Sequence, residues 1–372
     1  MVPACRLSPF PLVSADPNSV SPDQAPLRNS HHGGFRGELR KNPGRRAASA
    51  VKVLATLMVV AALTGCGSNG ATGGAPPPNS IFNGTPPVPV FSVNHKIFGW
   101  GLGPFVLAGQ DPNQGTVVPA AQLQYLINDA AQYAVWIRTF GTSNTLQQAG
   151  LYIHQAGAKA MIGAYLGNPG TANGAQANQQ ELDRLVTMAN AGQADIVAVG
   201  DETLLTGALT ESQLLAYIAS VKSQVPATVQ VGTVDTWNVL AAHPNVIQAV
   251  DVVLANIYPF WEDATASNAL GTLQSDYAQI LQASGGKPLL IAETGWPSSG
   301  APSAQAPAAI PSPSNQLAYF LAAQQWARAN NINIIWFEAF SEPWKANYND
   351  YPSWGIFDSN YLVESQFADA FQ

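Results

Sequence analysis

Eight short apolar runs, separated by longer amphipathic stretches, occupy the chain from about residue 91 onward. Each run has four to six residues of mostly continuous apolar character, which is typical of strands buried on both faces of a parallel sheet. The predicted strands are Ile97–Gly101, Val135–Phe140, Ala160–Tyr165, Ile196–Gly200, Val229–Val234, Val252–Ile257, Leu289–Ala292 and Ile332–Phe337. The clearest helix-like stretches between them are Ala120–Tyr133, Thr145–Ala156, Glu211–Gln224 and Asn315–Ala329.

This alternation predicts an α/β protein in which residues 93–372 form one (β/α)8 TIM barrel, a single catalytic domain. An open, doubly wound sheet is the alternative. No glycine-rich phosphate-binding fingerprint follows the first strand, which weakens a nucleotide-binding version of that alternative. In a barrel, the chemistry is expected at the carboxyl ends of the strands.

The charge of the chain is low and unevenly distributed. Residues 1–52 contain eight Lys/Arg and three Asp/Glu, out of totals of 16 and 23, so the rest of the chain carries 8 − 20 = −12. An acidic body is a poor polyanion binder, which argues against a nucleic-acid partner. The body contains no cysteine beyond Cys66 and only three scattered histidines, so neither a metal nor another cofactor is expected.

Residues 1–66 read as a leader that ends in an export signal. A basic segment at 41–46 precedes the short apolar run Val53–Leu63, which is the pattern of a secretory signal peptide. Residues 63–66 read LTGC and resemble the bacterial lipobox, in which the cysteine, here Cys66, is lipidated. The alternative is a simple signal peptide with a chance cysteine. The lipobox implies an exported protein, anchored at the bacterial cell envelope through lipid alone.

A tether follows the leader at residues 67–92. Between residues 67 and 90 the chain has five Gly and six Pro, with Ser, Asn and Thr among them. Such a composition favours a segment that is part flexible and part polyproline-like. It would hold a globular domain away from a membrane surface.

Two carboxylates follow predicted strands directly, at the edge where a barrel carries its chemistry. Glu202 follows the fourth strand and Glu293 follows the seventh. One protonated and one ionised carboxyl, facing each other, can cleave an acetal. Aromatic side chains gather at the same predicted edge, and their rings suit the apolar faces of sugars. The alternative is that both residues are solvated loop residues.

Six short segments follow one another along the predicted barrel: RTFG at 138–141, VGDE at 199–202, NIYPF at 256–260, IAETGWPS at 291–298, EAFSEPWK at 338–345 and WGIFD at 354–358. In this order, over residues 95–360, they resemble the motifs of glycoside hydrolase family 17, the β-1,3-glucanases. The segment at 291–298 resembles the family's nucleophile motif. The segment at 199–202 is similar to its acid/base motif, usually Gly-Asn-Glu.

The resemblance implies roles for individual residues. Glu202 would be the acid/base and Glu293 the nucleophile of a retaining reaction, with the carboxyl groups about 5–5.5 Å apart. Tyr258 would donate its hydroxyl to Glu293, and Arg138 would organise the carboxylates. Lys345, paired with Glu342 beside the cleft floor, would also lower the pKa of the nucleophile. The remaining candidates for sugar binding are Asp201, Asp235, Trp237, Asn256 and Trp296, with Trp261 and Trp344 as further platforms.

Each of these roles has a plainer alternative. A tryptophan near the edge is as readily part of the core, Arg138 is as readily half of a structural ion pair, and Glu342 with Lys345 as readily a surface salt bridge. Tyr258 is alternatively a rim aromatic.

Asp201 departs from the family, which usually has Asn before the acid/base. That Asn donates its amide hydrogen to the sugar 2-hydroxyl, and an ionised Asp cannot donate. Two states of Asp201 stay open. An ionised Asp201 would raise the pKa of Glu202, whereas a protonated or averted Asp201 would leave Glu202 untouched.

The sequence therefore predicts a retaining glycosidase that acts on β-1,3-glucan or its oligosaccharides. Hydrolysis and transglycosylation use the same glycosyl-enzyme, so the motifs do not separate them. A catalytically weak glucan-binding surface lipoprotein is the alternative from another class, motivated by Asp201. A monomer is expected.

Overall fold

The structure is a computed structural model of the chain, and it describes residues 96–368 and residue 370. The predicted leader, the lipidation site Cys66 and the tether at 67–92 lie outside the described residues and stay predictions. Within the described part, no helix is both long enough and apolar enough to cross a membrane.

The eight strands form one closed barrel in which neighbours in the chain are neighbours in space, and every pair is parallel. The ring closes where Trp100 of the first strand lies opposite Trp336 of the last. The strands are β1 (Ile97–Gly101), β2 (Ala134–Thr139), β3 (Lys159–Ala164), β4 (Ile196–Asp201), β5 (Gln230–Thr236), β6 (Val253–Asn256), β7 (Leu289–Thr294) and β8 (Ile334–Trp336). This confirms the predicted (β/α)8 barrel and excludes the open sheet.

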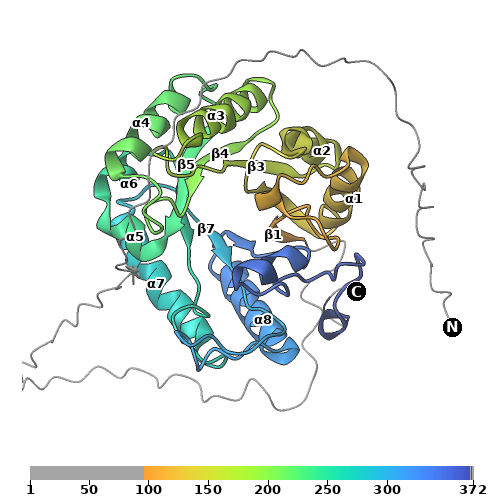
Figure 1. Cartoon of the computed structure of the whole chain (residues 1–372). Coiled ribbons are helices and arrows are strands. Elements are labelled where there is room, and N and C mark those ends of the chain that lie inside the picture. Colours follow the sequence, from red (N-terminus) through yellow and green to blue (C-terminus); the bar gives the residue numbers. More distant parts are fainter. Residues whose placement is uncertain (1–95, 369, 371–372) are drawn as a thin grey trace, which may run out of the picture. The chain divides into compact units, whose positions relative to one another are not determined.

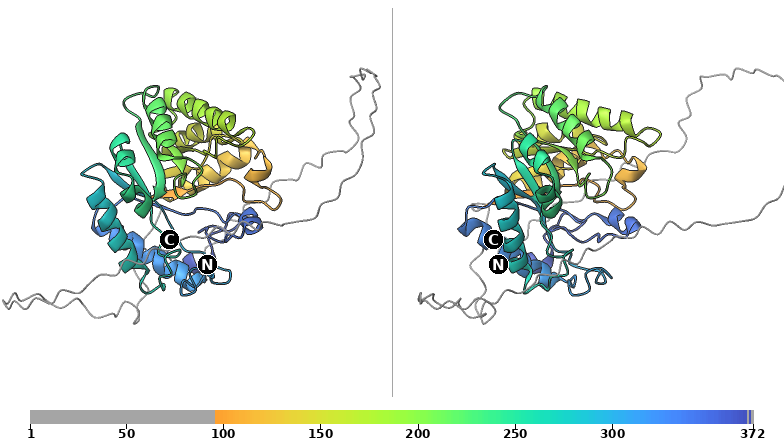
Figure 2. Two further views of the ribbon diagram at one scale, coloured as in Figure 1. Left: turned by 60° about the vertical axis from the view of Figure 1, so that its left-hand side comes forward. Right: turned by 90° about the vertical axis from the view of Figure 1, so that its left-hand side faces the viewer.

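Helices lie outside the ring of strands in all three views (Figures 1 and 2). They are α1 (Ala120–Ala130), α2 (Ala149–Gln155), α3 (Gly174–Asn190), α4 (Glu211–Lys222), α5 (Trp237–Ala242), α6 (Pro244–Ala249), α7 (Ala269–Ala283) and α8 (Pro313–Ala329). Four short 3-10 helices are η1 (Pro112–Gln114), η2 (Leu146–Gln148), η3 (Pro343–Tyr348) and η4 (Ser365–Phe367). Each of the first seven strands is followed by at least one α-helix before the next, as the alternation predicts.

Local sequence signals set where two of these helices begin. Thr210 caps α4 through a reciprocal capping box with Gln213, which satisfies backbone N–H groups that the first turn leaves free. Ser312 caps α8 because its side chain accepts a hydrogen bond from the backbone N–H of Asn315. Pro313 begins the helix at a position where no backbone N–H is needed.

Apolar side chains form two layers that alternate along each strand. Along β3, Ala160 and Ile162 face the helices, whereas Met161 belongs to a smaller cluster. That inner cluster consists of Met161, Ile196, Ala198, Val234, Val252, Leu254, Leu290, Ala292 and Ile335. It fills the barrel because residues that alternate with the helix-facing ones on parallel strands point to the enclosed face.

The pairing register breaks at the ends of the strands that carry the two candidate carboxylates. It shifts between Ala198 and Asp201 on β4, and again between Ile291 and Thr294 on β7. Such irregularities re-aim side chains. Both β4 and β7 also extend beyond their predicted ends, so that Glu293 lies within β7 rather than after it.

Candidate active site

One guanidinium connects two of the predicted site residues across the barrel. Arg138, at the end of β2, is 1 % exposed, and it donates to Asp201 Oδ2 at 2.6 Å and to Glu293 Oε1 at 2.5 Å. A further bond from the same side chain to the backbone carbonyl of Ala292 fixes its direction. The guanidinium lies 4.6 Å from the ring centre of Phe140, so an aromatic face covers one side of it.

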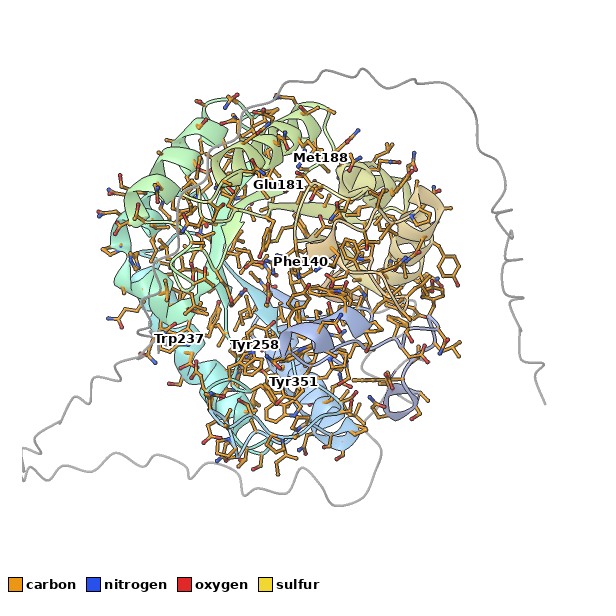
Figure 3. All side chains as sticks on the ribbon, viewed as in Figure 1. Phe140, Glu181, Met188, Trp237, Tyr258 and Tyr351 are labelled. Atoms are coloured by element: carbon orange, nitrogen blue, oxygen red, sulfur yellow. The ribbon has the colours of Figure 1, made fainter. Side chains whose placement is uncertain are left out.

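Glu293 accepts a second strong hydrogen bond on its other oxygen. The hydroxyl of Tyr258 donates to Glu293 Oε2 at 2.7 Å, in a position that Figure 3 places within the ring of helices. Burial raises the pKa of Tyr258 well above its usual range, and the nearby charge of Glu293 adds to the shift. Tyr258 therefore keeps its proton, and both oxygens of Glu293 have donors that stabilise the ionised form.

Glu202 has the opposite environment. It follows β4 with a positive φ of 49°, and its Oε1 accepts from the side-chain amide of Asn256 at 2.9 Å. Burial raises the pKa of Glu202 to about 7, the charge of Glu293 adds to the shift, and the Asn256 amide opposes it. At neutral pH, a large fraction of Glu202 therefore carries the proton that a general acid must supply.

Asp235 does not lie where a sugar can reach it, which corrects the expectation that it binds substrate. Its side chain is fully buried, and it accepts from the backbone N–H groups of Leu204 and Thr236, each at 2.9 Å. Its carboxylate thus anchors the turn that follows Glu202. The physical reason for the error is that a polar residue at a strand end can turn toward loop backbone as well as toward the cleft.

Lys345 and Glu342 are also buried, and they form a triad with Glu338 rather than a pair that reaches the nucleophile. Lys345 Nζ contacts Glu342 Oε2 at 3.0 Å and makes a closer ion pair with Glu338. None of the ion pairs in residues 96–368 joins Lys345 to Glu293, and both carboxyl partners of Lys345 belong to the triad. Glu342 also accepts from the backbone N–H of Phe105, which ties the loop after β1 to the loop after β8.

Glu338 is a buried residue for which the sequence predicted no role of its own, beyond its place in the segment 338–345. It is 0 % exposed, and burial raises its pKa well above the usual range, although Lys345 opposes the shift. It directly follows the predicted strand Ile332–Phe337, as the two predicted catalytic carboxylates follow their predicted strands, and this signal could have singled it out.

Of the tryptophans predicted to bind sugar, one lies in the core and the others are partly or largely exposed. Trp296 is fully buried, and its indole N–H donates to the carbonyl of Ile310, so the expectation that it binds sugar is wrong. Trp261 is 43 % exposed, Trp344 is partly buried, and Trp237, the first residue of α5, is half-buried (Figure 3). The indole N–H of Trp237 donates to Glu262 at 2.7 Å, which fixes the direction of the ring.

The site thus contains one carboxyl, Glu293, with a strong donor at each oxygen, and one carboxyl, Glu202, whose pKa is raised to about 7, above a packed barrel. Within the described residues, no group of three or more His, Cys, Asp or Glu side chains is placed to hold a metal ion. Paired carboxyls with such unequal surroundings, at the carboxyl ends of β4 and β7, define the protein as a glycoside hydrolase.

The chain belongs to the family of the BtgE/BtgC glycoside hydrolase domain, whose profile matches residues 108–355. It is 30 % identical over 288 residues to a glucan 1,3-beta-glucosidase of Saccharomyces cerevisiae, covering 70 % of this chain and 90 % of that protein. It is similar in structure to a glycoside hydrolase family 17 β-1,3-glucanosyltransferase of Rhizomucor miehei, with 26 % identity and a TM-score of 0.63. That match covers 73 % of this chain and 97 % of the other.

An endo-laminarinase from Formosa Hel1_33_131 matches at 18 % identity and a TM-score of 0.60, over 73 % of this chain and 86 % of the other. At this identity the likeness shows the barrel fold alone.

Replacing Tyr258 by Phe removes the donor to Glu293 Oε2 and leaves the ring in place. A hydrogen bond to a charged group contributes about 1.5–3 kcal/mol, so the ionised form of Glu293 should lose part of its stabilisation. Since the nucleophile must be ionised, the acid limb of the kcat/KM profile should move to higher pH. Tyr319→Phe is the matched control, because it removes a buried hydroxyl that contacts Thr294 instead. An acid limb that moves equally in both variants would contradict the role of Tyr258.

Proposed function

We propose that this glycoside hydrolase is a retaining enzyme of the family 17 type that acts on β-1,3-glucan. The observation that carries the proposal is the unequal pair of carboxyls: Glu293 has two donors, whereas Glu202 is partly buried and has a pKa of about 7. The names of the relatives describe enzymes that act on 1,3-linked β-glucan, and this supports the proposed substrate class.

In the first step, Glu202 gives its proton to the glycosidic oxygen as the bond from that oxygen to the anomeric carbon breaks. A carboxylate oxygen of Glu293 bonds to the same carbon from the opposite face, which forms a glycosyl-enzyme. Glu293 loses its charge in this step, and Glu202 becomes ionised. Arg138 and Tyr258 position the attacking carboxylate through both of its oxygens.

In the second step, ionised Glu202 takes a proton from an incoming hydroxyl, whose oxygen bonds to the anomeric carbon. The bond to Glu293 breaks, and two successive inversions restore the original configuration. With water as the incoming group the reaction is hydrolysis, and with a sugar hydroxyl it is transglycosylation. The likeness to the Rhizomucor miehei glucanosyltransferase favours transfer as the second candidate function.

Incubation of the purified chain with a defined β-1,3-linked oligosaccharide tests the proposal and separates these two outcomes. Mass spectrometry should detect products shorter than the substrate for hydrolysis, and additional products longer than the substrate for transfer. No change in the substrate would contradict the enzymatic proposal and favour a glucan-binding lipoprotein.

Substitutions of the two carboxylates should have different signatures. Glu293→Gln removes the nucleophile while keeping its shape, so turnover should fall by several orders of magnitude. Glu202→Ala should damage natural glycosides much more than substrates with a good leaving group, which need no proton. Added azide should rescue the latter and yield a β-glycosyl azide. An α-azide product, or equal damage to both kinds of substrate, would overturn the assigned roles.

We also propose that the protein is exported and held at a bacterial cell envelope by lipid on Cys66. The support is in the sequence: a basic segment, a short apolar run and the lipobox-like LTGC that ends at residue 66. The Gly- and Pro-rich segment at 67–92 would then act as a tether between the anchor and the barrel.

Cys66→Ser should move the protein from the membrane fraction to the soluble fraction, because it removes the lipidated thiol. Stable anchoring requires more than one acyl chain, so the parent should resist a salt wash. Fractionation and immunoblotting of both forms measure this. Cys5→Ser is the matched control and should leave the distribution unchanged; a Cys66→Ser variant that stays with the washed membranes would rule out the lipid anchor.

A further inference from the structure

Asp201 and Glu293 share a single cation. Arg138 donates to both carboxyls, one through each terminal nitrogen, and no other ion pair within residues 96–368 involves either of them. If both carboxyls were ionised, the group of three would carry one net negative charge. An uncompensated charge is costly where little water can solvate it, and the side chain of Asp201 is only 17 % exposed.

Three carboxyls surround Asp201, and within the described residues Arg138 is the one cation with which it forms an ion pair. Glu202 is the next residue in the sequence, Asp235 lies on β5, and Glu293 lies on β7, while β2 supplies Arg138. Burial raises the pKa of Asp201 well above its usual range; Arg138 opposes this, and the three neighbouring carboxyls add to it. The charges that face Asp201 therefore favour one bound proton.

The hydrogen bonds indicate which of the two carboxyls holds that proton. Both oxygens of Glu293 accept from strong donors, Arg138 and Tyr258. Asp201 has a donor only at Oδ2, and its Oδ1 is buried without a hydrogen-bond partner. A carboxyl with both oxygens bonded is stabilised as the ion, whereas an oxygen without a donor is where a proton costs least.

We propose that Asp201 works as a neutral carboxylic acid, which leaves the charge of Arg138 to the nucleophile Glu293. Oδ2 is then the carbonyl oxygen that accepts from Arg138, and Oδ1 carries the hydrogen. Only the role of Glu293 as nucleophile rests on the proposed function; the protonation state of Asp201 does not. A neutral Asp201 also has the same donor and acceptor groups as an Asn in its place.

Infrared difference spectroscopy of the substrate-free protein tests the protonation state directly. The measurement is made at about pH 8.5, where Glu202, with a pKa of about 7, is mostly ionised. The parent should show a protonated carboxyl band that is absent from Asp201→Asn. Glu202→Gln is the matched control, since it should remove such a band only at about pH 6 and below. Loss of a carboxylate band, instead of a protonated one, in Asp201→Asn would overturn the proposal.

A second measurement needs no substitution of Asp201 and covers the case in which Asp201→Asn does not fold. Carbon-13 labelling of the aspartate carboxyls in the parent shifts only aspartate bands. Burial also raises the pKa of Asp235, so the labelled spectrum is compared with that of labelled Asp235→Asn. A protonated band that shifts with the label at about pH 8.5 and is kept in Asp235→Asn supports the proposal, and absence of any such band from the parent contradicts it. Since neither spectrum involves substrate, each judges Asp201 even if turnover of β-1,3-glucan is not found.

Kinetics provide an independent readout. If Asp201 were ionised, its removal in Asp201→Asn would lower the pKa of Glu202 and move the alkaline limb of kcat/KM to lower pH. A neutral Asp201 predicts that the limb stays in place, whatever happens to the rate at the optimum. Asp201→Ala, which lacks both donor and acceptor, should have a kcat/KM about tenfold or more below that of Asp201→Asn. A displaced limb would refute the neutral state.

Discussion

The buried guanidinium of Arg138 is the interaction on which the site depends. It joins β2 to the ends of β4 and β7, so the two strands that carry the catalytic carboxyls are held to one fixed cation. Its bond to the carbonyl of Ala292 and the covering ring of Phe140 restrict its position. A rigid cation can set the protonation of both neighbours without a cost of reorganisation at the moment of reaction.

The two catalytic roles follow from this unequal distribution of donors. Glu293 has Arg138 and Tyr258 as partners and is stabilised as the ion. Glu202 is partly buried and has only one neutral amide as a donor, and its partial burial raises its pKa to about 7. Glutamate thereby supplies both the nucleophile and the acid, because the two side chains differ in their surroundings and not in their chemical structure. A neutral Asp201 completes the arrangement, since it leaves the cation to Glu293.

Buried carboxylates also fix the loops around the mouth of the barrel. Asp235 accepts from loop backbone after β4 and β5, Glu342 accepts from the loop after β1, and Glu181 of α3 accepts from Thr142 and Tyr165. Each bond satisfies backbone N–H groups that would otherwise be free in a buried loop. In a chain with only 10 % charged residues, these three carboxylates are used to position the rim.

The sequence by itself determined the eight strands, their alternation with helices, and the placement of Glu202, Glu293 and Arg138 at one edge, because periodicity and chain order are local properties. Only the tertiary structure decided that Trp296 is core, that Asp235 holds backbone, and that Lys345 pairs with Glu338. Side-chain direction at a strand end depends on register shifts such as the one before Asp201, and on what packs opposite. No local pattern encodes these, since they arise when distant strands meet.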